Sequence, residues 1–170
     1  MPEAYRRLPL RRRLTVIMLC LLIVLTLAFI FGNSLEDRQT SAAASEQFER
    51  IVEPLLRALP YERLHTKDAL SVITRKLAHF GEFFMLGAQL MALSLLVRPV
   101  MLVRKRYILL ASLLTAAADE LLQFVSRRAP QVQDALLDTF GALCGILFVY
   151  GIHHMYARVF GQSSKGGIHA

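Results

Sequence analysis

The chain has 170 residues, of which 55% are hydrophobic, and its formal net charge is +7 at pH 7. A mean hydropathy of +0.44 excludes an ordinary soluble domain. Four stretches approach or exceed the roughly 18 apolar residues that indicate a helical membrane span. We therefore predict a single all-α domain, a bundle of four transmembrane helices.

The first predicted span covers residues 14–31 and follows a basic segment, residues 1–13, that we place in the cytoplasm. This run contains no charged residue. A cleaved signal peptide would have a shorter apolar region, and the small residues Ala42–Ala44 lie too far beyond this one to form its cleavage site. The first span is therefore predicted to be retained.

An amphipathic helix is predicted in the loop after the first span, over Glu46–Leu59. Its apolar residues recur near i, i+3, i+4 and i+7, which gives one hydrophobic face. Pro54 should kink this helix and Pro60 should end it. Two placements stay open: the helix lies on the outer membrane surface, or it packs on the other spans.

The remaining spans are predicted at about residues 77–97, 107–125 and 132–152, so that the transmembrane domain covers 14–152. A short connection makes the second and third spans antiparallel neighbours, and another does the same for the third and fourth spans. Residues 153–170 form the predicted cytoplasmic tail.

The distribution of positive charge predicts a bacterial plasma-membrane protein with both termini in the cytoplasm, because short cytoplasmic segments are rich in Lys and Arg. The same distribution explains the net charge through topology and contact with anionic lipids, so no nucleic-acid partner is expected. The basic residues on the predicted inner side are Arg6, Arg7, Arg11, Arg12, Arg13, Arg98, Arg104, Lys105, Arg106, Arg158 and Lys165.

Several ionisable residues lie inside the predicted spans, where a charge costs at least a few kcal/mol and usually marks a functional site. Helical rise places all of them in the outer half of the membrane, with Asp119 about 18 Å above the inner surface. The predicted helical stripes would bring them together as an outer-facing polar pocket. Its expected members are Arg75, Lys76, His79, Glu82, Asp119, Glu120, Gln123, Arg128, Asp134 and Asp138.

Two further properties are predicted from these stripes. Gly141 and Gly145 continue the stripe of Asp134 and Asp138 and should permit close helix approach. No cofactor is required by any motif, but a divalent metal is an alternative, because one histidine and several carboxylates can supply ligands. The candidate ligands are His79, Glu82, Asp119 and Asp134. The opposing interpretation is that the polar groups only hold the helices together.

The chain resembles the VanZ-like family of small membrane proteins over about residues 75–145. Arg75–Phe83 (RKLAHFGEF) is similar to the family's R-K-x-x-H-x-x-E-Y/F block, and Asp119–Gln123 (DELLQ) is similar to the D-E-x-x-Q part of its D-E-x-x-Q-x-F block. Arg128, Asp134 and Gly141 match R-x5-D-x6-G in spacing. Each block falls on the expected span or at its outer end.

The chain departs from the family pattern at two places. Asp138 stands where the family usually has Asn, which adds a carboxyl group to the pocket. Ser126-Arg127 stands where the family usually has Pro-Gly, so the outer turn differs. The family's name comes from a member linked to teicoplanin resistance, and the resemblance therefore implies a role in the cell envelope.

Three functions are compatible with the sequence. The favoured one is a protein that binds a lipid-linked or lipophilic envelope molecule, or a lipoglycopeptide, and affects teicoplanin-type antibiotic susceptibility. The first alternative is an intramembrane metal- or acid/base-dependent enzyme acting on an envelope lipid, which is less favoured because no hydrolase motif occurs. The second is a proton-coupled transporter. Membrane lipids are expected partners, and a homo-oligomer stays open.

Overall fold

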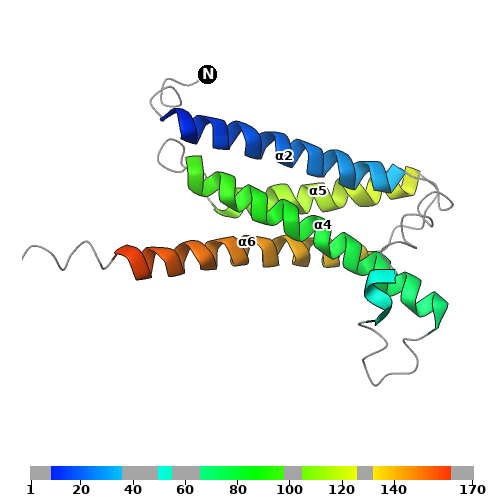
Figure 1. Ribbon diagram of the computed structural model, residues 1–170. Coiled ribbons are helices and arrows are strands. Elements are labelled where there is room, and N and C mark those ends of the chain that lie inside the picture. The colour runs from blue at the N-terminus through cyan, green and yellow to red at the C-terminus, as the bar shows by residue number, and fades with distance from the viewer. Residues whose placement is uncertain (1–8, 36–49, 55–65, 98–104, 126–131, 162–170) are drawn as a thin grey trace, which may run out of the picture.

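The computed structural model contains four long helices, which confirms the predicted all-α bundle (Figure 1). They are α2 (Leu10–Leu35), α4 (Lys67–Val97), α5 (Lys105–Val125) and α6 (Val132–Gly161), and each is long and apolar enough to cross a membrane. The structure describes residues 9–35, 50–54, 66–97, 105–125 and 132–161.

All four helices extend beyond the predicted spans. α2 covers Leu10–Leu35 instead of 14–31, and α5 begins at Lys105, two residues before its predicted start. α4 begins at Lys67 instead of near residue 77, and α6 continues past residue 152 to Gly161. With 31 residues, α4 is about 46 Å long, compared with a hydrocarbon core of about 30 Å. Hydropathy marks only the apolar part of a helix, whereas backbone hydrogen bonding continues into its polar ends.

The predicted amphipathic helix is described only in part. Residues 50–54 are helical, with Val52 buried and Ile51 exposed. Pro54 is the last described residue of this segment. The rest of Glu46–Leu59, including the predicted end at Pro60, lies outside the described residues.

The helices alternate in direction along the chain. α4 and α6 run parallel and share the most extensive contact in the bundle, while α2 and α5 run opposite to them (Figure 1). The start of α2 and the end of α6 therefore lie at one end of the bundle. At the other end, α2 and α5 finish and α4 and α6 begin, so four chain segments from distant parts of the sequence meet there.

Glycine allows α4 and α6 to approach closely, as the sequence predicted. A Cβ atom on Gly145 would lie 2.0 Å from the carbonyl oxygen of Phe84, and one on Gly141 would lie 2.6 Å from that of Phe80. On the facing helix, a Cβ on Gly87 would lie 2.1 Å from the carbonyl oxygen of Ala142. Side chains at these positions would force the two backbones apart.

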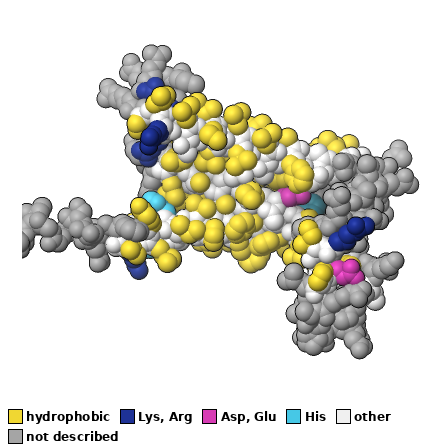
Figure 2. Space-filling model, in the orientation of Figure 1, with side chains coloured by type: hydrophobic (Ala, Val, Ile, Leu, Met, Phe, Trp, Pro, Cys, Tyr) yellow, Lys and Arg dark blue, Asp and Glu magenta, His cyan; other side chains and the backbone are white. Residues whose placement is uncertain are grey.

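The apolar core lies next to this contact and draws on all four helices. It contains Ile30 of α2, Phe83 and Leu86 of α4, Ala116 of α5 and Ala142 of α6. Many large apolar side chains remain exposed on the outside, and they form a broad hydrophobic band across the middle of the visible face (Figure 2). This pattern suits helices surrounded by lipid, where the outer surface is as apolar as the interior.

Candidate functional site

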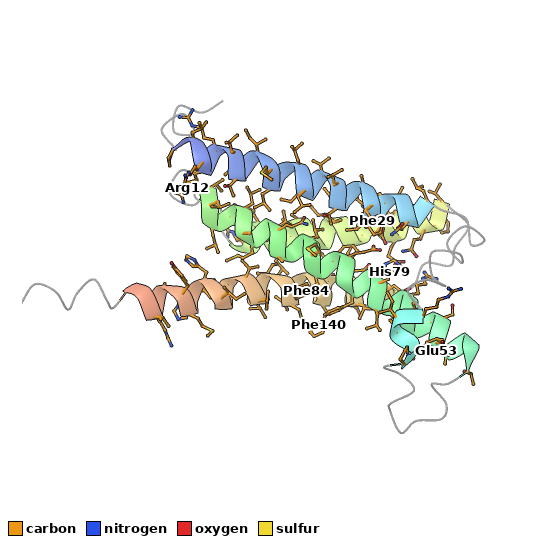
Figure 3. All side chains as sticks on the ribbon, in the orientation of Figure 1. Arg12, Phe29, Glu53, His79, Phe84 and Phe140 are labelled. Carbon is orange, nitrogen blue, oxygen red and sulfur yellow. The ribbon has the colours of Figure 1, made fainter. Side chains whose placement is uncertain are left out.

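Polar side chains from all four helices gather at the end where α2 and α5 finish. Figure 3 places His79 on α4 near this end of the bundle. We call the group the polar cluster, and hydrogen bonds and short ionic contacts connect its members. Its members are Asn33, Ser34, Arg75, Lys76, His79, Glu82, Asp119, Gln123, Asp134 and Asp138.

Asp119 lies at the centre of the polar cluster and is fully buried. Its Oδ1 accepts a short hydrogen bond from the hydroxyl of Ser34 on α2. Its Oδ2 accepts a second one, of 2.9 Å, from Nε2 of Gln123 one turn further along α5. Gln123 in turn accepts a hydrogen bond from Nη2 of Arg75 at 3.2 Å. This relay fixes the Asp119 carboxylate relative to three helices.

Two cations of α4, Arg75 and Lys76, lie around Asp134 of α6, and we call this pair the cationic rim. Nζ of Lys76 lies 2.7 Å from Oδ1 of Asp134, and Nη2 of Arg75 lies 3.6 Å from its Oδ2. The Asp134 side chain is 8% exposed, whereas those of Arg75 and Lys76 are 42% and 38% exposed. The carboxylate is thus compensated inside the protein while both cations remain accessible at the surface.

His79 lies between two carboxylates. Its Nδ1 is 3.6 Å from Oδ1 of Asp138 and 3.9 Å from Oδ2 of Asp119. Both aspartates are fully buried, and the His79 side chain is 12% exposed. Within the described part of the chain, neither oxygen of Asp138 nor Nδ1 of His79 has a hydrogen-bond partner. One nitrogen and two carboxylate oxygens therefore face one another and could hold a metal ion.

Glu82 lies one helical turn beyond His79 on the same face of α4. Its Oε1 accepts a hydrogen bond of 2.9 Å from Nδ2 of Asn33 near the end of α2. The carboxylate is half-buried and held by a neutral donor. This contact adds a second polar connection between α2 and the rest of the polar cluster.

Eight of the ten predicted pocket residues belong to the polar cluster. They are Arg75, Lys76, His79, Glu82, Asp119, Gln123, Asp134 and Asp138. Arg128 lies outside the described residues. Glu120, adjacent to Asp119 on α5, is half-buried. Among the predicted metal ligands, His79 and Asp119 face each other, but Asp138 completes the group in place of Asp134, which pairs with Lys76.

Asn33 and Ser34 are site residues that the sequence did not place in the pocket. The predicted first span ends at residue 31, which leaves both residues in the loop that follows this span. In the structure α2 continues to Leu35, and Ser34 is buried at 2% exposure. The depth of Asn33 and Ser34 in the membrane could have identified them. Both residues directly follow the uncharged first span, which places them at the same depth as the other polar groups.

The family model described as VanZ/LLP1 matches residues 15–154, and this range contains the complete polar cluster. No curated protein and no solved structure matches the chain.

Proposed function

The chain belongs to the VanZ/LLP1 family, and we propose that it is a cell-envelope protein that binds a lipid-linked or lipophilic envelope molecule at the polar cluster. The proposal depends on one observation, the accessible cationic rim. Within the described residues, Arg75 and Lys76 provide two positive charges and contact one carboxylate, that of Asp134. Counted over these three residues, the rim carries an excess of one positive charge, which favours an anionic head group.

The cationic rim is suited to binding an anion, because Arg75 and Lys76 are already held in place by contacts inside the protein. Nη2 of Arg75 makes both of the contacts described above, to Gln123 and to Asp134. A guanidinium group has five N–H donors on three nitrogens, so a phosphate or carboxylate can bind to the others. The surrounding apolar surface would hold the acyl or prenyl chain of the same molecule.

Altered antibiotic susceptibility follows as part of this proposal. A protein that holds an anionic envelope lipid at the outer membrane surface changes what is available there to a lipoglycopeptide. The expected phenotype is a change in the accumulation of a teicoplanin-type compound at the cell surface. This phenotype requires the cluster to face outward, as the positive-inside distribution predicts.

The test is a binding measurement on the full-length protein in detergent, with a polyprenyl phosphate compared with the corresponding polyprenol. We expect the phosphate to bind more tightly, and Arg75→Gln or Lys76→Gln to weaken it by about tenfold, since a charge-assisted hydrogen bond contributes about 1.5–3 kcal/mol. The matched control is Arg106→Gln, because Arg106 is exposed at the other end of the bundle. Equal affinity for the polyprenol and the polyprenyl phosphate would contradict the proposal.

An intramembrane enzyme acting on such a lipid is the second candidate. The observation in its favour is His79, whose Nδ1 lies within 4 Å of two buried carboxylates. Such a histidine can transfer protons in general acid–base catalysis. Incubation of the same polyprenyl phosphate with wild-type protein and His79→Gln distinguishes the two functions. Conversion of the lipid by wild type alone supports an enzyme, whereas binding without conversion supports the first proposal.

A further inference from the structure

We infer that His79, Asp119 and Asp138 form a binding site for one divalent first-row transition-metal ion, of the Zn²⁺ or Mn²⁺ kind. Each residue offers one ligand atom, and these atoms all lie within 4.8 Å of one another. The three residues come from α4, α5 and α6. The bound ion would therefore connect three helices below the cationic rim.

The strongest support is the environment of the Asp138 side chain. Its side chain is fully buried, and neither carboxylate oxygen has a hydrogen-bond partner among the described residues. Nδ1 of His79, which faces it at 3.6 Å, is unpartnered in the same part of the chain. Buried polar atoms are almost always satisfied, because a buried polar atom without a partner destabilises the folded state. A metal ion bound to Nδ1 of His79 and to one oxygen of Asp138 would give both of these buried side chains a partner.

Charge balance supports a cation of charge +2. Asp134 is compensated by Lys76 and Arg75, as described above. For Asp119 and Asp138, the only ionic contact within the described residues is with His79. A divalent ion with a neutral imidazole would balance the two carboxylates and leave the site without net charge. Buried charges are otherwise costly in an apolar surrounding.

The outer contacts of Asp119 are those expected around a metal ligand. Ser34 and Gln123 each donate a hydrogen bond to one of its oxygens, and each oxygen retains a lone pair for an ion. Such supporting hydrogen bonds orient metal-binding carboxylates and histidines. The two hydrogen bonds to Asp119 come from Ser34 on α2 and from Gln123 on the next turn of α5. The orientation of Asp119 therefore does not depend on the ion.

Distances and ligand types select the kind of metal. Zn–N and Zn–O bonds of about 2.0–2.2 Å in a tetrahedron correspond to ligand separations of about 3.3–3.5 Å. The two separations from Nδ1, 3.6 and 3.9 Å, exceed these values by a few tenths of an ångström. All three ligand atoms lie within 4.8 Å of one another, so binding would draw the three side chains together. An imidazole nitrogen favours a transition metal, whereas Mg²⁺ and Ca²⁺ prefer oxygen ligands alone. Water or the head group of a bound lipid would complete the coordination.

The competing explanation is a proton in place of the metal. A neutral Asp138 could donate a hydrogen bond to Nδ1 of His79, which would satisfy that nitrogen and one oxygen of Asp138 without any ion. This arrangement would need no added cation, and a chelator would not affect it. The two explanations therefore differ in metal content and in the response to chelation.

The experiment measures metal bound to the full-length protein in detergent, after treatment with EDTA and reloading with Zn²⁺, Mn²⁺ or Mg²⁺. We expect about one Zn²⁺ or Mn²⁺ per chain after desalting, no retained Mg²⁺, and a higher apparent Tm with the bound metal, because a ligand that binds only the folded state stabilises it. Asp138→Asn should lose the metal and the rise in Tm. Asp134→Asn, one turn earlier on α6, should retain both.

Wild-type protein that retains neither Zn²⁺ nor Mn²⁺, or an Asp138→Asn variant that binds as well as wild type, would overturn the inference. If Asp138→Asn does not fold, His79→Gln and the wild-type response to EDTA still decide it. The metal site rests on His79, Asp119 and Asp138, whereas the proposed lipid binding rests on Arg75 and Lys76. Metal is measured without any envelope lipid, so either proposal can fail while the other holds.

Discussion

Asp119 is the residue through which the polar cluster is connected, because it contacts a donor on α2 and another on α5 and faces His79 on α4. Asp119→Asn and Glu82→Gln keep the side-chain shape and can still hydrogen-bond, so both variants should accumulate as folded membrane protein. If the carboxylates bind a cation or position a head group, loss of charge should reduce function to the level of a deletion strain.

This prediction is checked by measuring surface accumulation of a teicoplanin-type lipoglycopeptide beside the amount of protein in the membrane. Retention of full function by both variants would assign the carboxylates to helix packing, since an amide suffices for that role.

The Lys76–Asp134 ion pair should stabilise the fold as well as shape the rim. Among the described residues, Lys76→Met leaves the buried Asp134 carboxylate with Arg75, at 3.6 Å, as its remaining cation. We expect the free energy of unfolding in detergent to fall by about 1–3 kcal/mol, toward the lower end because Lys76 is partly exposed. The double variant Lys76→Met/Asp134→Asn should recover most of the loss. Additive losses in this double-mutant cycle would show that the pair does not interact.

At the level of single residues, the sequence predicted which polar groups gather but not how they pair. Asp134 and Asp138 lie on one stripe of α6, and periodicity cannot tell which of them faces His79. That choice depends on the register between α4 and α6, which the glycine contacts determine. Ser34 was missed because hydropathy does not detect a helix that continues into polar sequence.

The contact between α4 and α6 leads to a prediction about whole elements. Gly145→Ala should destabilise the bundle by about 1–3 kcal/mol, because its Cβ would meet the backbone of Phe84, which cannot move aside as a flexible side chain could. Gly151→Ala is the matched control on α6, since nothing lies within 4 Å of the added Cβ. The control should stabilise the helix by up to about 1 kcal/mol. The measurement is unfolding of both variants in detergent, and equal stability would contradict the close approach.

Element positions were predicted better than element lengths. Long, predominantly apolar runs specified four spans, and the i, i+4 glycines on α6 indicated the face of that helix that approaches a neighbour most closely. Polar ends such as the first turns of α4 carry little hydropathy signal, so the helix start at Lys67 preceded the predicted span. Helical hydrogen bonds satisfy the backbone wherever the chain lies in lipid, which is why apolar length alone predicts spans well.

For the molecule as a whole, the polar cluster and the arginine-rich start of α2 lie at opposite ends of the bundle. Arg11, Arg12 and Arg13 are at one end, together with Arg158 near the end of α6 (Figure 1). Arg75, Lys76 and the buried carboxylates are at the other. Because of this separation, the orientation of the protein alone determines which compartment has access to the polar cluster.

Orientation can be tested by cysteine labelling in intact cells with a reagent that does not cross the membrane. The background should carry Cys20→Ala and Cys144→Ala, since both native cysteines are free and Cys20 is exposed on α2. A cysteine at Ser41 should be modified, and one at Lys105 should be modified only after the cells are opened, because short basic segments remain in the cytoplasm. The reverse pattern would place the cationic rim in the cytoplasm. Binding of an anionic lipid there could still occur, but contact with an extracellular lipoglycopeptide could not, so this result would separate the binding proposal from its proposed effect on antibiotic susceptibility.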